Sequence, residues 1–180
     1  MPGKRQIRPE RPVYPTPAAL ITTMDEAAGR PNIISLGEVF NISISDPVIL
    51  GIAVRKERWS HRLISQTREF VVNLPTCRLA AQVWTCGSCS GRDTDKFART
   101  GLTPLPATRV RPPLIAECPV NIECRVTAIQ EVGDHDLFLG EALVEHVDEA
   151  ALDADGRIRV DRLDGFALVC GQFRAFGRRL

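Results

Sequence analysis

The sequence predicts a mainly β protein, built as an antiparallel, Greek-key-like barrel with helical insertions. Short segments rich in apolar and β-branched residues recur along the chain, and glycine, proline or aspartate bounds most of them. The helical patterns between these segments are short. Strands and helices do not alternate regularly, so a parallel sheet made of βαβ units is not expected.

Turn-forming residues bound most of the expected strands. The expected strand 18–24 is followed by a hairpin-type loop that contains Gly29 and Pro31. Residues 120–127 alternate between apolar and polar side chains, as in a strand with one buried face. The expected strands are residues 18–24, 32–45 with an interruption at Gly37, 48–54, 70–74, 119–131, 137–147 and 165–171.

Three short helices are expected between the strands. They cover residues 60–67 with Ser60 as N-cap, residues 78–85, and residues 94–100 with Asp93 as N-cap and Gly101 as the C′ stop. Residues 86–91 contain glycine, serine and cysteine and are expected to form a loop.

The chain of 180 residues suits one domain, with residues 1–13 as an extended arm and residues 14–180 as the folded unit. The arm is basic and proline-rich and no apolar segment follows it, so a secretory signal is not expected. The net charge of +1 gives no argument for a nucleic-acid partner. No apolar run approaches the ~20 residues of a membrane span, so no membrane partner is expected.

A cluster of cations and hydroxyls follows the apolar strand at 48–54. It begins with Arg55 and Lys56 and continues through Arg58 to Ser60, at the start of an expected helix. Free N–H groups at a helix start, together with nearby cations, suit an anion such as a phosphate ester. Composition alone favours a solvated surface with Ser60 as a plain helix cap.

Small polar residues on the preceding strands change this balance. The tripeptides SLG at 35–37 and NIS at 41–43 can form a strand edge whose backbone hydrogen-bonds a flat heterocycle. The segments YPTPAALITTMDEAAGRPNIISLG (14–37), SDPVILGIAVRKERWSHRLI (45–64), EFVVNLP (69–75), SGRDTDKF (90–97), GLTP (101–104) and LFLGEALVEHVDE (137–149) then follow in order.

In the order and spacing of these segments, the chain resembles the flavin reductase-like, FMN-binding split-barrel proteins, and most of all their flavoredoxin-type branch. The resemblance covers roughly Tyr14 to the C-terminus. It departs from the family at Asp46-Pro47-Val48, where many relatives have two consecutive prolines, and at the pair Cys86 and Cys89, which is not a family hallmark.

The resemblance implies a homodimer with one FMN per subunit near the dimer interface. Residues Asn32, Ile33, Ser35, Leu36, Gly37 and Asn41 would border the flavin ring and ribityl chain, and Arg55, Lys56, Ser60 and His61 would meet the phosphate. The segment 90–97 would form a wall, with Lys96 as a further anion contact. The simpler alternative is that Asp93 caps a helix and that Asp95 and Lys96 lie on the surface.

All six cysteines are expected to be reduced thiols in the cytoplasm, because the chain is long enough to build its own core. Cys86 and Cys89 allow three interpretations. A thioredoxin-type dithiol would open a helix after a strand, whereas the segment before Cys86 reads as helical. Zinc with Cys118 and Cys124 would need a five-residue gap, wider than the usual two to four. Two reduced loop thiols are favoured, although a thiol near a flavin can be redox-active.

The resemblance implies an FMN oxidoreductase that passes electrons from NADH or NADPH to a flavin, ferric or other small acceptor. No Gly-x-Gly-x-x-Gly fingerprint follows a strand, so the nicotinamide nucleotide would be a transient co-substrate in an open cleft. No catalytic side chain and no metal are expected, since a flavin carries its own redox chemistry. The alternatives are an FMN electron carrier reduced by a protein donor, and a non-catalytic flavin-binding or storage protein.

Overall fold

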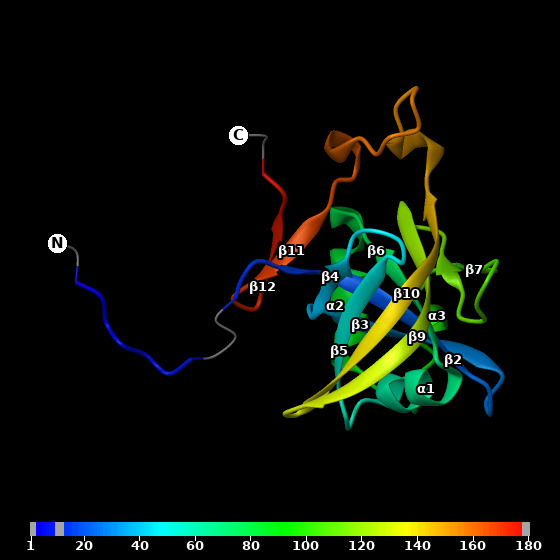
Figure 1. Ribbon diagram of the computed structural model, residues 1–180, viewed down its shortest axis with the longest axis horizontal. Coiled ribbons are helices and arrows are strands. Elements are labelled where there is room, and N and C mark those ends of the chain that lie inside the picture. The colour runs from blue at the N-terminus through cyan, green and yellow to red at the C-terminus, as the bar shows by residue number, and fades with distance from the viewer. Residues whose placement is uncertain (1–2, 10–12, 178–180) are drawn as a thin grey trace.

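A seven-stranded antiparallel sheet dominates the computed structural model, which describes residues 3–9 and 13–177 (Figure 1). The strand order across it is β3-β2-β6-β9-β10-β5-β4. The bounds are β2 Ala19–Asp25, β3 Arg30–Leu36, β4 Val39–Ser43, β5 Ile49–Arg55, β6 Glu69–Leu74, β9 Val120–Val132 and β10 His135–Val147. The predicted mainly β class is therefore confirmed.

The two edge strands of this sheet follow one another in the chain. β3 and β4 lie at opposite ends of the strand order, yet only Gly37 and Glu38 separate them. A link of two residues spans less than ~10 Å, so the edges meet only if the sheet curls. The backbone N–H of Ala53 donates to the carbonyl of Glu38 at 3.0 Å and ties this link to β5.

The curled sheet encloses an apolar interior. Its fully buried side chains include Phe70, Phe138, Ile21 and Ile52. Gly140 on β10 faces Phe70 so closely that a Cβ there would lie 2.6 Å from the ring, so this position needs glycine. Alternating residues of β2 and β3 point inward, and the others point to the opposite face.

Helices pack against the sheet. α1 (Trp59–Thr67) follows β5, and a 3₁₀ turn (Cys77–Leu79) leads into α2 (Ala80–Ser88), with α3 (Lys96–Thr100) after it. α2 and α3 cover the opposite face, whereas Ile64 of α1 belongs to the interior cluster. Leu20 and Ile33 from the sheet pack against Val83 of α2 and Phe97 of α3 in a second apolar cluster. α2 and α3 are therefore held against β2 and β3.

Smaller β elements complete the fold. The predicted strand 165–171 is wrong in its extent: the chain forms β11 (Phe166–Val169) and β12 (Gln172–Ala175), with Cys170 and Gly171 at positive φ in the turn. β11 also pairs with β1 (Thr16–Pro17), and β7 (Pro104–Leu105) pairs with β8 (Leu114–Ile115).

The helix termini correct three further predictions. α1 begins at Trp59, so Arg58 and not Ser60 is its N-cap. α2 runs through Ser88, so the first half of the predicted 86–91 loop is helical. Asp95, not Asp93, caps α3 by accepting from the N–H of Ala98 at 3.0 Å. Gly101 ends α3 in the left-handed conformation, as predicted.

The predicted arm at 1–13 lies partly outside the described residues. Residues 3–9 are exposed, have no regular secondary structure and extend away from the barrel (Figure 1). The division into an arm and one domain stays a prediction.

Glu123 on β9 is a fully buried carboxylate that organises the loop between β7 and β8. It accepts from the N–H groups of Thr108, Arg109 and Val110, from the Thr108 hydroxyl, and from His146 Nε2 at 2.6 Å. Burial by itself raises the pKa of Glu123, but these hydrogen bonds outweigh it and lower the pKa from 4.5 to about 2.

The lowered pKa predicts how stability depends on pH. The ionised Glu123 contributes to the free energy of unfolding. This contribution is fully present above pH 4.5 and is lost as the pH falls toward 2, because Glu123 takes up a proton at a higher pH in the unfolded chain than in the folded one. Glu123→Gln should lower the free energy of unfolding at pH 7 by ~1–3 kcal/mol. It should also reduce the acid limb, which is the fall of the free energy of unfolding with decreasing pH below 4.5. Urea unfolding from pH 7 to pH 3 measures both, and an unchanged acid limb in the variant would contradict the assignment.

Candidate functional site

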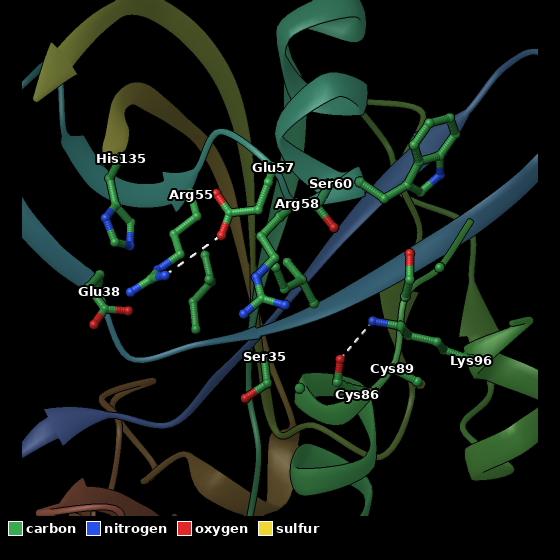
Figure 2. Close-up of a pocket in the computed structure, with 16 residues that line it drawn as sticks. Ser35, Glu38, Arg55, Glu57, Arg58, Ser60, Cys86, Cys89, Lys96 and His135 are labelled. Carbon is green, nitrogen blue, oxygen red and sulfur yellow. Dashed lines mark hydrogen bonds and ion pairs between the residues drawn. The ribbon is translucent and has the colours of Figure 1, made fainter. Parts of the chain in front are cut away.

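A cleft of about 190 Å³ lies where β3, the end of β5 and the start of α1 come together, with the end of α2 and the loop before α3 as its other wall (Figure 2). Its position follows from closure, since curling brings β3 beside the strand pair β4 and β5. The cleft is lined by Ile34, Ser35, Leu36, Glu38, Arg55, Glu57, Arg58, Trp59, Ser60, Cys86, Gly87, Cys89, Ser90, Gly91, Lys96 and His135.

The start of α1 supplies uncapped N–H groups to this cleft. The N-cap Arg58 is extended (φ −74°, ψ 137°), no side chain accepts from the first turn, and that turn contains no acidic residue. Trp59 and Ser60, the first two helical residues, line the cleft. Unpaired N–H groups and the helix dipole make this helix start attractive to an anion.

Two guanidinium groups reinforce that attraction. Arg58 reaches from the start of α1 toward Ser35 (Figure 2) and forms no ion pair with any residue in 3–9 or 13–177. Arg55 is half exposed and lies 3.7 Å from Glu57 and 3.4 Å from Asp134, so its charge is partly neutralised. Arg58 is therefore the more available cation for a ligand.

Asn32 does not line the cleft but connects the elements beneath it. Its Nδ2 donates to Ser60 Oγ at 2.8 Å and to Thr23 Oγ1 at 3.0 Å, so it links β3 to α1 and β2. Its Oδ1 is buried and has no hydrogen-bond partner. A Cβ on Gly91 would lie 1.7 Å from this oxygen, so the loop passes as closely as glycine allows. Because Ser60 Oγ accepts from Asn32, its O–H remains free to donate to a ligand.

Lys96 is a buried cation in the opposite wall. Its Nζ donates to the carbonyl oxygen of Cys86 at 2.6 Å, where the last turn of α2 leaves carbonyls unpaired. Burial lowers the pKa of Lys96, and the nearby Cys86 and Cys89 oppose that shift. Lys96 thus stabilises the end of α2 at the edge of the cleft. The alternative that Lys96 is an ordinary surface residue is wrong.

Trp59 lines the cleft and contacts two guanidinium groups. The guanidinium carbon of Arg62 lies 5.2 Å and that of Arg92 lies 5.0 Å from the centre of its ring, within cation–π range. The Nε1 of Trp59 is buried without a partner. Two cations therefore flank Trp59 at the edge of the cleft.

The structure brings five of the eleven residues expected at the site into the cleft: Ser35, Leu36, Arg55, Ser60 and Lys96. Lys56 instead forms an ion pair with Glu131, and His61 Nε2 lies 2.8 Å from Asp136 Oδ2, both on the β9–β10 hairpin. The bond to Glu131 is the main cause that raises the pKa of Lys56.

The remaining predicted residues serve the fold. Ile33 is fully buried under α2 and α3, and Gly37 packs against Thr16 of β1, where a Cβ would lie 2.9 Å from Oγ1. Asn41 is exposed on the edge strand β4. A strand presents alternate residues to one face, so residues 32–37 do not all face one ligand.

Sequence reasoning found only part of the wall opposite α1. Ser90, Gly91 and Lys96 belong to the segment 90–97 that was expected to form a wall, and all three line the cleft. On the α1 side, Arg58 stands within the cation cluster but was not included among the expected contacts. Cys86 and Cys89 were noted as loop thiols, yet the structure places both on the cleft. No local signal marks Glu38 or His135, which reach the cleft through barrel closure.

Comparisons with known proteins identify the family of the chain. Residues 11–162 match the flavin reductase like domain family. The chain belongs to this family. It is 39% identical over 145 residues to an uncharacterized protein of Archaeoglobus fulgidus, covering 81% of this chain and 78% of that protein. It is 28% identical over 141 residues to the NADH:riboflavin 5'-phosphate oxidoreductase of Streptomyces pristinaespiralis, covering 77% and 74%.

A solved flavin reductase-like structure has the same fold. The flavoredoxin of Desulfovibrio vulgaris (Miyazaki F) superposes with a TM-score of 0.91 at 29% identity, covering 99% of this chain and 96% of that chain. The resemblance to the flavin reductase-like split-barrel proteins is therefore confirmed.

Two further properties hold across residues 3–9 and 13–177. None of the helices there has both the length and the apolar character that a membrane-spanning helix needs. No group of three or more His, Cys, Asp or Glu side chains there is arranged to hold a metal ion. Cys118 and Cys124 are buried in separate apolar clusters, so the zinc interpretation with Cys86 and Cys89 finds no support.

The contact between Gly91 and Asn32 is testable by substitution. Gly91→Ala should lower the free energy of unfolding on the order of 1–3 kcal/mol, since the new methyl group collides with a buried side chain. Gly177→Ala is the matched control, because nothing lies within 4 Å of a Cβ there. In the Asn32→Ala background the cost of Gly91→Ala should fall; equal costs in both backgrounds, measured by denaturant unfolding, would contradict the contact.

Proposed function

We propose that this protein is an FMN-dependent oxidoreductase of the flavin reductase type. The observation that carries the proposal is the cleft in which the uncapped start of α1 and Arg58, which has no ion pair within the described part of the chain, face the edge of β3. That arrangement suits a phosphate ester at one end and a flat heterocycle at the other. Membership of the flavin reductase-like family supports FMN as this ligand.

The residues of the cleft divide into two groups in this proposal. The N–H groups of Trp59 and Ser60, the Ser60 hydroxyl, and the guanidinium groups of Arg55 and Arg58 would hold the phosphate. The backbone at 35–37 would border the flavin ring, with Lys96 and Gly87 from the opposite wall. Lys56, His61, Ile33 and Asn41 are not proposed as contacts, because their described positions lie outside the cleft.

A bound FMN would supply the acceptance and release of hydride, and the residues of the chain would bind, orient and tune it. Backbone N–H groups at 35–37 would stabilise negative charge on the reduced ring. The two cations that flank Trp59 would attract an anionic nucleotide. NADH or NADPH is the proposed donor, and the name of the Streptomyces relative supports NADH.

An FMN electron carrier reduced by a protein donor is the second candidate. The similarity to a flavoredoxin favours it. Steady-state oxidation of NADH and NADPH, with free flavin or a ferric chelate as acceptor, separates the two candidates. Turnover supports the reductase, whereas FMN binding without turnover of either nucleotide supports the carrier or a storage role.

A second copy of the chain is the proposed partner. The edge strand β4 and the turn after it expose four apolar side chains, which form the β4 surface: Phe40, Ile42, Ile44 and Val48, with exposed fractions of 43%, 50%, 83% and 37%. An apolar edge strand invites pairing unless it is covered. We propose that this surface forms a homodimer interface.

The phosphate contacts predict a specific loss of affinity. Arg58→Ala should weaken FMN binding about tenfold, or ~1.4 kcal/mol, because one charge-assisted contact is lost. Lys56→Ala is the matched control: it removes the same charge two positions away, from a side chain bound to Glu131 outside the cleft. Flavin fluorescence titration measures both, and equal effects would contradict the assignment. A protein that binds no FMN at all would contradict the flavin proposal.

The β4 surface predicts a change of oligomeric state. Ile42→Asp with Ile44→Asp should shift the protein from dimer to monomer in sedimentation velocity, because two charges would be buried in the interface. Ile158→Asp, another exposed apolar residue, is the control and should leave the dimer intact. A wild-type protein that sediments as a monomer would contradict the proposal.

A further inference from the structure

Cys86 and Cys89 lie on the wall of the cleft, and none of the proposed FMN contacts uses their thiols. Cys86 belongs to the last turn of α2 and Cys89 is its C-cap. Figure 2 shows both residues beside Lys96. Both are free cysteines. The other four cysteines do not line the cleft.

The spacing of the pair suits a disulfide. Residues i and i+3 at the end of a helix have Cβ atoms ~5–6 Å apart, slightly more than the ~3.5–4.5 Å of a disulfide. Cys89 has left the helix: its backbone is extended, with φ −132° and ψ 160°. Formation of a disulfide needs the two Cβ atoms to approach by about 1–2 Å, and Cys89, as the extended C-cap, is the residue of the pair that lies outside α2.

The two thiols differ in accessibility, which gives them different roles. Cys86 is fully buried, and burial raises its pKa to about 11 although the charge of Lys96 opposes the shift. Cys89 is half buried, and its Sγ–H donates to the carbonyl of Thr85 at 3.3 Å. An incoming molecule in the cleft can reach Cys89 first, and Cys86 stands behind it as a resolving thiol.

We propose that Cys86 and Cys89 are a reversible dithiol–disulfide centre whose substrates are small-molecule disulfides that enter the cleft. Cys89 first loses its proton to solvent. Its thiolate then attacks one sulfur of the substrate, the S–S bond breaks, and one thiolate leaves and takes up a proton. Cys86 then loses its proton to solvent, attacks the Cys89 sulfur and expels the second thiolate, which is protonated. The protein loses two electrons and two protons, and the disulfide is reduced to two thiols.

The location at a helix C-terminus predicts a low reduction potential for the disulfide of this centre. In thioredoxin-type motifs a helix N-terminus stabilises the thiolate and so favours the reduced form. Here the cysteines face the carbonyl end of α2, which gives no such stabilisation to a thiolate. The oxidised form should therefore persist until a reductant arrives. This centre goes beyond the proposed FMN function and does not depend on it.

The test uses glutathione disulfide as the probe on the purified protein, followed by alkylation of free thiols and peptide mapping by mass spectrometry. The wild type should lose two hydrogen atoms through a Cys86–Cys89 disulfide that dithiothreitol reverses. Cys86→Ala should keep a glutathione adduct on Cys89, because the resolving thiol is missing. Cys170→Ser, which removes an exposed cysteine outside the cleft, should behave as the wild type.

Two results would overturn the proposal. One is alkylation of both Cys86 and Cys89 in wild type after equilibration with the probe. The other is an adduct on Cys89 that persists in wild type as it does in Cys86→Ala. Both measurements on the wild type stand even if Cys86→Ala, a substitution in an apolar cluster, fails to fold. Disulfide formation measured on the wild type without FMN, beside FMN titration of the reduced wild type, keeps this test separate from that of the flavin site.

Discussion

Closure of the sheet through the two-residue link between β3 and β4 is the constraint on which the rest of the structure depends. Gly37 and Glu38 connect strands at opposite ends of the strand order, so the sheet must curl. Curling creates the enclosed core around Phe70 and Phe138. It also brings β3 beside the end of β5 and the start of α1, where the cleft lies. The same step thus produces the core and the candidate site.

Charge is distributed so that some cations hold the fold while others remain available. Lys56 pairs with the β9–β10 hairpin and Lys96 holds the end of α2. The buried carboxylate of Glu123 is satisfied by backbone N–H groups and His146. Arg58, in contrast, faces the cleft without an ion pair among the described residues. A ligand phosphate at the α1 start would give that charge its partner.

The sequence was sufficient for features that depend on local chemistry. The main strands, the Gly101 stop and the cation cluster after β5 are local patterns, and the structure confirms their positions. The partners of Lys56 and His61 lie 75 residues away in the chain, so no local pattern shows that the hairpin recruits them. The extension of α2 through Ser88 likewise depends on packing of Val83 and Cys86 against the sheet. That extension changed Cys86 and Cys89 from loop thiols to residues of the cleft wall.

Hydrogen–deuterium exchange with and without saturating FMN tests the central claim most directly, because it locates the ligand on the backbone. Bound FMN should slow exchange at 34–37, at Trp59 and Ser60, and at 87–91, and should leave 129–132 of the hairpin, which do not line the cleft, unchanged. Protection of the hairpin without protection of the α1 start would contradict the account, because the phosphate would then lie with Lys56 and His61.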